Sequence, residues 1–469
     1  MTQDPSRRAF LNRSARLAAL VGSQAALPLA LNLAAMGEAA AFSASDYKAL
    51  VCVFLLGGND HANTVVPYDA ASYAQYAAAR STVALSRDAL AGTALTPTVG
   101  GQQFALHPAM GALAGLFNAG HAAVQFNVGP LVVPLTRAQY ASGNRGAYPL
   151  PPKLFSHNDQ QSVWQSDGAE GTTVGWGGHL GDLALSSNGS ALFTCISVNG
   201  NAVFLAGQQA LQYQISPTGA VPVNALGGSV YGSGAVSGLL GELVQSASGH
   251  LLEAEYARVT QRSINAVGQV NGALAGANLG TAFPKGSLGD QLKMVARLIA
   301  ARNALGVKRQ VFFVSLGGFD LHDNLLTNHP GLLGQVSDAL TAFYNATAEL
   351  GVAGQVTAFT ASDFGRTLSS NGNGSDHGWG SHHFVVGGAV RGAAFYGTPP
   401  PISLGNTTAP EDQWHVGQGR LLPSTATDQY AATLARWFGV ADAELAQVLP
   451  HIGNFGGAGY PVNLGFFNS

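Results

Sequence analysis

The chain has 469 residues with a formal net charge of −3, and only 10% of its residues are charged whereas 46% are apolar. Low charge with ordinary apolar content argues against intrinsic disorder, and the absence of a basic tract argues against a partner that is nucleic acid. The 61 glycines follow no three-residue period, which excludes a collagen-like chain.

The first forty residues are typical of an export signal. Arg7 and Arg8 precede Phe10 and Leu11, residues 17–37 carry no charge, and small residues follow at 39–41. A basic start, an apolar middle and a small-residue end indicate a signal peptide, and the arginine pair matches the twin-arginine pattern. We therefore expect residues 1–41 to be removed after export by the twin-arginine translocase. The alternative is a membrane anchor, because about 20 apolar residues can span a bilayer.

The mature chain, residues 42–469, is expected to form one α/β domain in the periplasm or outside the cell, without a stable membrane span. Its predicted buried strands are 49–56, 122–128, 191–197, 310–316 and 355–361. Apolar residues recur at helical spacing in 288–305 and 331–350. Strands that alternate with helices indicate a mostly parallel central sheet flanked by helices. Residues 198–240 are rich in Gly, Ser and Asn, and we expect an irregular insertion there.

Carboxylates and imidazoles follow several of the predicted strands, where α/β sheets gather their functional sites. They are Asp60 after the first strand, Asp320 and His322 after the fourth, Asp363 after the fifth, and Asp376, His377 and His382 just beyond. Asp and His together bind Zn²⁺ or similar divalent ions, and two ions about 4 Å apart would clamp a displacement at phosphorus. The pattern predicts a divalent metal cofactor of one or two ions, with zinc as the favoured metal.

Each of these clusters also has a structural explanation. The Gly-Gly-Asn-Asp motif that ends at Asp60 is typical of a turn, and Asp320 with His322 could cap a helix. Asp363 could form a buried ion pair with Arg366. The sequence lacks G-x-S-x-G, G-x-x-x-x-G-K-[ST] and G-x-G-x-x-G motifs, so it does not support an α/β-hydrolase triad, a P-loop or a dinucleotide site.

Eight short motifs between the N-terminus and residue 440 recur together in one bacterial family. They are the twin-arginine segment at 6–11, VFLLGGND at 53–60, Ser-His at 156–157, GGFDLH at 317–322, SDFGRT at 362–367, SDHG at 375–378, GRLLP at 419–423 and DQYAATLARWFGV at 428–440. The chain, from about residue 46 to 456, resembles the family catalogued as domain of unknown function 1501. That family is similar to the alkaline phosphatase and sulfatase superfamily. The resemblance implies an alkaline-phosphatase-like fold with two metal ions and a Ser, Thr or modified Cys nucleophile.

The resemblance also implies roles for individual residues. Asp60 matches the first metal-ligand Asp of the superfamily, and Asp320 with His322 matches a second Asp and His. Asp363 has the place of the next carboxylate ligand, with the imidazole supplied by His377 or His382. Asp376 and His377 instead have the superfamily's Asp-His dipeptide.

The resemblance implies a nucleophile, and Ser156 is the candidate because it lies beside His157 in a polar cluster. The predicted catalytic residues are Ser156, His157 and Arg366. Arg366 would hold the non-bridging oxygens of the substrate. The alternative for Ser156 is that it caps a helix through 158–166.

The sequence thus predicts an exported metal-dependent hydrolase that acts on phosphate or sulfate esters of a small molecule or polymer. The alternative is a non-catalytic exported protein with a degenerate site, serving as a binding or envelope component. It is motivated by Phe364, which follows Asp363 where the superfamily has His.

Overall fold

The computed structural model describes residues 44–221, 233–246, 251–457 and 459–468, so the predicted signal segment at 1–41 lies outside the described residues. Within them the strands are β1 (Lys48–Leu55), β2 (Val65–Pro67), β3 (Phe104–Leu106), β4 (Ala122–Gly129), β5 (Cys195–Ser197), β6 (Gln212–Ser216), β7 (Gly219–Ala220), β8 (Arg309–Leu316), β9 (Val356–Ser362), β10 (Ser381–Gly387), β11 (Ala394–Tyr396) and β12 (Thr425–Ala426).

The helices of the same residues complete the list of elements. They are α3 (His61–Thr64), α4 (Ala70–Arg80), α5 (Gly111–Asn118), α6 (Arg137–Ala141), α7 (His157–Ser166), α8 (Trp176–Ala184), α9 (Gly234–Gln245), α10 (Leu251–Ala275), α11 (Ser287–Ala300), α12 (Arg302–Leu305), α13 (Leu325–Glu349), α14 (Thr427–Phe438) and α15 (Leu445–Val448). Among the described residues, no helix is both long and apolar enough to cross a membrane.

A large sheet forms the centre of the molecule. Its strand order is β11-β4-β10-β9-β1-β8-β5-β6-β7, with β12 beside β4. β1 pairs in parallel with β8 and β9, whereas β10 is antiparallel to both β9 and β4. The prediction of a mixed α/β chain with a mostly parallel sheet is therefore confirmed.

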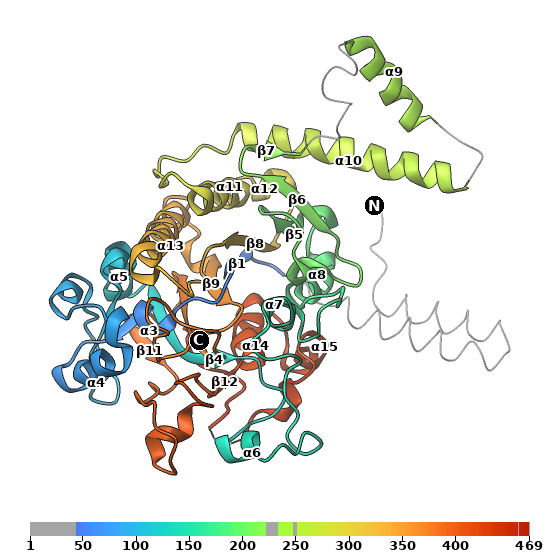
Figure 1. The fold of residues 1–469 in the computed structure, drawn as a ribbon. Coiled ribbons are helices and arrows are strands. Elements are labelled where there is room, and N and C mark those ends of the chain that lie inside the picture. The colour runs from blue at the N-terminus through green and yellow to red at the C-terminus, as the bar shows by residue number, and fades with distance from the viewer. Residues whose placement is uncertain (1–43, 222–232, 247–250, 458, 469) are drawn as a thin grey trace.

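Helices cover both faces of this sheet, which explains why the central strands are apolar without alternation (Figure 1). Along β1, Val51 and Val53 pack in the core that includes residues of α5, α11 and α13. Cys52 and Phe54 point to the opposite face and pack in the core that includes residues of α8 and α14. Successive residues of one strand thus enter two different cores, as the strand period of two requires.

One predicted strand differs from the structure. Only the end of the strand expected at 191–197 pairs, as β5, because the Asn188 side chain accepts hydrogen bonds from the backbone N–H groups of Lys308 and Arg309 at the start of β8. Of the region 198–240, residues 222–232 lie outside the described residues, and the rest contains β6, which pairs with β5, and the first half of α9.

The register of the parallel strands places their carboxyl ends together. Leu55 of β1 lies opposite Leu316 of β8 and Ser362 of β9. The loops that follow these three strands therefore emerge at one edge of the sheet. They carry most of the predicted functional residues.

Candidate metal centre

The loops after β1, β8 and β9 contact one another closely at Gly57. Gly57 has a φ of +114°, and a Cβ on it would lie 2.4 Å from the backbone nitrogen of Asp320. Its N–H also donates a hydrogen bond of 3.1 Å to Asp363 Oδ1. Only glycine fits this position, and the contact fixes both carboxylates relative to β1.

Four side chains converge at this edge of the sheet, and we call them the His/Asp cluster: His157, Asp320, His322 and His377. His377 Nε2 lies 3.0 Å from His157 Nε2 and 2.9 Å from His322 Nε2. The Asp320 carboxylate lies 3.4 Å from the Nε2 atoms of His157 and His377 and 3.1 Å from that of His322. One ligand atom from each of His157, Asp320 and His377 lies within 4.8 Å of the other two.

Each imidazole of the cluster makes a hydrogen bond through its Nδ1 atom, on the side of the ring away from the cluster centre. The carbonyl oxygen of Phe155 lies 2.7 Å from Nδ1 of His377, and since a carbonyl can only accept, that Nδ1 carries a proton. Asp363 Oδ2 lies 2.7 Å from Nδ1 of His157, and Asp376 Oδ1 lies 3.0 Å from Nδ1 of His322.

These contacts favour the tautomer in which Nε2 is unprotonated. The Nε2 lone pairs of His157 and His322 then each face that of His377 at about the separation of a hydrogen bond, which is repulsive unless a cation lies among them. A carboxylate or carbonyl behind each imidazole is also the arrangement that orients histidine ligands in metal proteins.

Charge and burial set the protonation states of the cluster. Asp363 raises the pKa of His157 through its hydrogen bond. Burial lowers the pKa of His377, and the neighbouring cationic groups lower it further. Burial alone would raise the pKa of Asp320, but the hydrogen bond and charge of Arg366 outweigh it and lower that pKa below its ordinary value. At neutral pH the cluster therefore offers a carboxylate and a neutral central imidazole.

The cluster is open to solvent on one side. The side chains of Asp320 and His322 are 47% and 44% exposed, whereas those of His157 and His377 are 25% exposed. Structural zinc sites are closed by four protein ligands, and catalytic sites keep a position open. Exposure of this kind is typical of the second class.

Asp60 is corrected from a predicted metal ligand to one half of a buried ion pair. Its side chain is 2% exposed and lies 2.7 Å from Nη2 of Arg80, which is fully buried. Ser375 donates to the same carboxylate at 2.6 Å, and Oδ1 accepts from the backbone of Asn63 at the start of α3. With these partners its oxygens are satisfied away from the His/Asp cluster.

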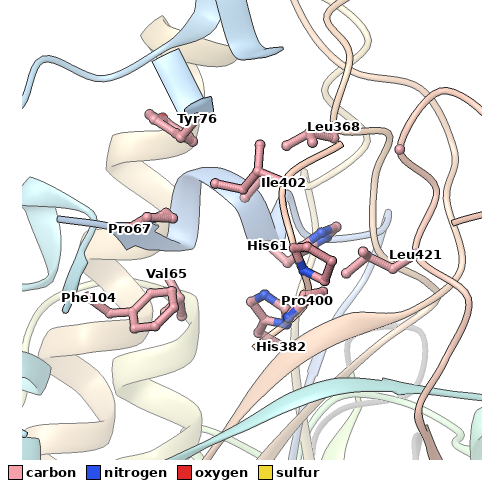
Figure 2. A pocket seen from close by; sticks show the side chains of 13 residues that line it. His61, Val65, Pro67, Tyr76, Phe104, Leu368, His382, Pro400, Ile402 and Leu421 are labelled. Atoms are coloured by element: carbon pink, nitrogen blue, oxygen red, sulfur yellow. The ribbon is translucent and has the colours of Figure 1, made fainter. Parts of the chain in front are cut away.

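His382 also lies outside the cluster. It is 6% exposed, and its Nδ1 accepts a hydrogen bond of 3.2 Å from the backbone N–H of Asn127. The proton is therefore on Nε2, and burial holds the pKa of the ring well below its usual range. With His61 it borders a small apolar cavity of about 50 Å³ (Figure 2). A protonated Nε2 is not a metal ligand, so this prediction is corrected as well.

Asp363 and Asp376 hydrogen-bond to Nδ1 of His157 and of His322 and so hold these two imidazoles of the His/Asp cluster. Asp363 is fully buried and receives the Gln161 amide at 2.8 Å in addition to His157. Asp376 receives the Asn371 amide at 3.0 Å in addition to His322. Both carboxylates thus belong to the site predicted from the sequence, but they orient imidazoles.

The two predicted groups that would handle the substrate are both engaged elsewhere. Ser156 occupies the position before α7, and its hydroxyl donates to Asp159 Oδ2 at 2.8 Å instead of capping the helix backbone. Arg366 is fully buried, and its three nitrogens donate to backbone carbonyls of Gly58, Ser375 and the neighbouring loops and to Asp320. Arg366, which we predicted to bind the substrate, therefore connects the loops after β1, β8 and β9 through its hydrogen bonds.

Sequence reasoning missed Arg420. Its Nε donates to the carbonyl of His377 at 2.7 Å, and its guanidinium lies 5.4 Å from the centre of the Phe155 ring. Among the described residues its terminal nitrogens have no hydrogen-bond partner. The signal was present in the GRLLP motif at 419–423, where Arg420 is the only charged residue.

Asp363→Asn is expected to weaken Zn²⁺ binding by about 10- to 100-fold while the protein stays folded, because removal of a carboxylate behind a ligating histidine has an effect of that size. Competition with a chromophoric chelator measures it. Asp338→Asn, which changes an exposed carboxylate on α13, is the matched control. Equal affinity in both variants would remove Asp363 from the site.

Comparisons with known proteins give a family match over part of the chain. Residues 250–452 match the family model described as "Protein of unknown function (DUF1501)". That range contains Asp320, His322, His377 and Arg420 but not His157. No curated protein matches. A solved structure titled "Crystal structure of Ps i-CgsB in complex with k-i-k-neocarrahexaose" is similar at a TM-score of 0.35 and 8% identity, over 87% of this chain and 77% of that one. A likeness that low supports no inference.

Proposed function

We propose that the chain is a metal-dependent hydrolase that acts on phosphate or sulfate esters. The observation that carries the proposal is the His/Asp cluster, in which three imidazole nitrogens and one carboxylate meet at an open edge of the sheet. Imidazole and carboxylate donors suit Zn²⁺ first among common divalent ions.

Three members of the donor set, His157, Asp320 and His377, fit one tetrahedral ion and leave its fourth position open. Two nitrogens each about 2.0–2.1 Å from one zinc lie roughly 3.3–3.4 Å apart, and the separations from His377 Nε2 are 2.9, 3.0 and 3.4 Å. Within the described ranges, no second group of three or more such side chains comes together. We therefore propose one ion rather than two.

The residues of the site divide the work of hydrolysis. His157, His377 and Asp320 would hold the ion and leave its fourth position open beside the exposed His322; when bound, the ion supplies Lewis acidity toward the ester and toward water. Arg420 is the group we assign to the non-bridging oxygens, because its terminal nitrogens donate no hydrogen bond within the described part of the chain and a guanidinium matches phosphate or sulfate.

We assign the attacking nucleophile to a water molecule that enters from the open side. The Ser156 hydroxyl donates to Asp159, so it would have to leave that carboxylate before it could attack an ester. Asp320 and His322 are the most exposed members of the cluster, which makes their side the entry path for water and substrate.

Two further parts of the proposal, the type of fold and export from the cytoplasm, are supported by the position of the site and by the sequence. An alkaline-phosphatase-like arrangement is supported by the place of the site beyond the carboxyl ends of β1, β8 and β9. Export to the periplasm or cell exterior is supported by the twin-arginine pattern at residues 6–11.

The test is ester hydrolysis by protein that has been stripped of metal and then reloaded. We expect 4-nitrophenyl phosphate or 4-nitrophenyl sulfate to be hydrolysed after addition of Zn²⁺, and activity to vanish again with a chelator. Stoichiometric metal binding without turnover of either ester would contradict the proposal.

A second function, a metal-binding protein without catalysis, is favoured by one observation. The predicted nucleophile Ser156 and the predicted clamp Arg366 are both committed to hydrogen bonds within the protein. Its signature would be the outcome just described, in which metal binds and no ester turns over.

Arg420→Ala is expected to lower kcat/KM for the ester roughly tenfold to hundredfold, because a hydrogen bond to a charged group is worth about 1.5–3 kcal/mol. Arg420→Lys should recover part of this loss, since it restores charge without the two-pronged geometry. Steady-state kinetics measure both. Arg145→Ala is the control, because that guanidinium also lies on an aromatic ring, at 5.5 Å from Tyr140. If Arg420→Ala and Arg145→Ala behave alike, Arg420 does not contact the substrate.

A further inference from the structure

Two carboxylates lie in contact at the junction of α7 and α14, on a different part of the fold from the His/Asp cluster centre. Asp167 is the residue that ends α7, with a left-handed φ of +56°. Asp428 is the second residue of α14 and is fully buried. The two carboxyl groups interact directly, and within the described part of the chain neither forms an ion pair with Lys or Arg.

Three oxygen atoms at this junction are buried without a hydrogen-bond partner: Asp167 Oδ2, Asp428 Oδ1 and Thr427 Oγ1. Thr427 is only 4% exposed. The other oxygen of Asp428 accepts the backbone N–H of His451 at 3.1 Å. A buried polar atom left unpaired is unfavourable, so three in one place indicate that a proton, water molecule or ion supplies the missing partner.

A cavity of about 30 Å³ lies at the same junction. Asp167, Thr427 and His451 line it together with apolar residues, among them Pro151 and Pro152. A volume of this size accommodates a single ion or water molecule. The unpaired oxygens of Asp167 and Thr427 therefore belong to side chains that border a space of the right size for one small ligand.

We propose that the α7–α14 junction binds a hard cation, Ca²⁺, through Asp167, Asp428 and Thr427. Carboxylate and hydroxyl oxygens are the donors that such ions prefer. Because the cavity has room for the ion alone, the rest of its six to eight ligands would be protein oxygens, backbone carbonyls among them. Asp167 also lies at the C-terminal end of α7, where the helix dipole attracts positive charge.

A shared proton is the competing explanation, and the threonine argues against it. Burial raises the pKa of Asp428 to about 7 and that of Asp167 well above its usual range, so without a cation the pair retains a proton at neutral pH. That proton would join the two carboxyl groups but would leave Thr427 Oγ1 unpaired. A cation bound in the cavity that Asp167 and Thr427 border, with Asp428 in contact with Asp167, would give all three oxygens a partner and displace the proton.

A cation at this junction would connect α7 to α14. α7 begins at His157, which belongs to the His/Asp cluster, and ends at Asp167. A cation at the junction would fix the far end of that helix to α14, independently of whether the cluster is catalytic.

The experiment measures Ca²⁺ binding by calorimetry, and the melting temperature with and without Ca²⁺, on chelator-treated full-length protein. We expect wild-type protein to bind one Ca²⁺ and to melt at a higher temperature when Ca²⁺ is added. Asp167→Asn and Asp428→Asn should each lose both effects. Asp338→Asn is the matched control, and His377→Ala should keep the Ca²⁺ response while it loses the metal of the cluster.

Thr427→Val keeps the shape of the side chain but removes the hydroxyl. It tests Ca²⁺ binding at the junction if the asparagine variants fail to fold. We expect it to weaken Ca²⁺ binding at least fivefold. The proposal is overturned if wild-type protein shows no Ca²⁺ response, or if the Asn or Val variants retain it. No Ca²⁺ response together with Asn variants as stable as wild type would assign the pair to a shared proton.

Discussion

Replacing His377 with alanine is expected to abolish stoichiometric Zn²⁺ binding and with it all ester hydrolysis, while the protein stays folded. His377 is the central member of the His/Asp cluster, with Nε2 within 3.0 Å of two other imidazoles and 3.4 Å from Asp320. Without it, the remaining ligands lose the one nitrogen that all of them face. We expect metal affinity to fall by more than about 100-fold, which exceeds the loss of about 10- to 100-fold expected for a residue behind a ligand.

Metal content by mass spectrometry and turnover of a nitrophenyl ester measure the two effects. His121→Ala is the matched control, because His121 stacks on Tyr344 next to the first residue of β4, at the opposite edge of the sheet from the cluster. His377→Ala protein that still binds one Zn²⁺ with wild-type affinity would show that the cluster is not the metal site.

Replacing Asp60 with asparagine is expected to have the opposite effect, a large loss of stability with metal binding retained. Arg80 is fully buried, and Asp60 is the acidic partner of its guanidinium, with Nη2 at 2.7 Å. Removal of one member of a buried ion pair leaves the other charge uncompensated and costs about 3–5 kcal/mol. The free energy of unfolding from chemical denaturation measures this loss.

The pH dependence of that stabilisation follows from the same pair. Burial alone would raise the pKa of Asp60, but Arg80 and the surrounding donors hold it below its ordinary value. A carboxyl with a lowered pKa in the folded state stabilises the protein above its ordinary pKa, and this contribution is lost as the pH falls through the folded-state pKa. The difference in stability between wild type and Asp60→Asn should therefore shrink at strongly acidic pH.

An exposed ion pair supplies the control for the buried one. Asp442 pairs with Arg436 and is 77% exposed, so Asp442→Asn should change stability by less than about 1 kcal/mol. Asp60→Asn protein that unfolds like wild type but has lost its Zn²⁺ would restore Asp60 as a metal ligand.

The strands and their order in the chain were predictable because they depend on local composition. Runs such as 49–56 and 310–316 are apolar without alternation, and only strands covered on both faces have that pattern. The clustering of Asp and His after these strands was also visible, since the carboxyl ends of parallel strands meet at one edge. Asp320, His322 and His377 were identified on this basis.

The roles of the individual polar residues were not predictable, because each depends on a partner distant in the chain. Asp60 does not join the His/Asp cluster because it forms an ion pair with Arg80, the last residue of α4. Arg366 is likewise engaged by the carbonyl of Gly58, which is distant in the chain. Ser156 is the exception, because its partner Asp159 lies only three residues away.

By itself, the sequence determined that this protein builds an α/β sheet and concentrates carboxylates and imidazoles at one edge, because hydrophobic pattern and strand ends are local properties. Only the tertiary structure decided which of those groups come together in the His/Asp cluster and present an unprotonated nitrogen to its centre. That choice depends on which imidazole nitrogen carries the proton, and hydrogen bonds from distant residues set it: Phe155 leaves Nε2 of His377 free, whereas Asn127 places the proton of His382 on Nε2.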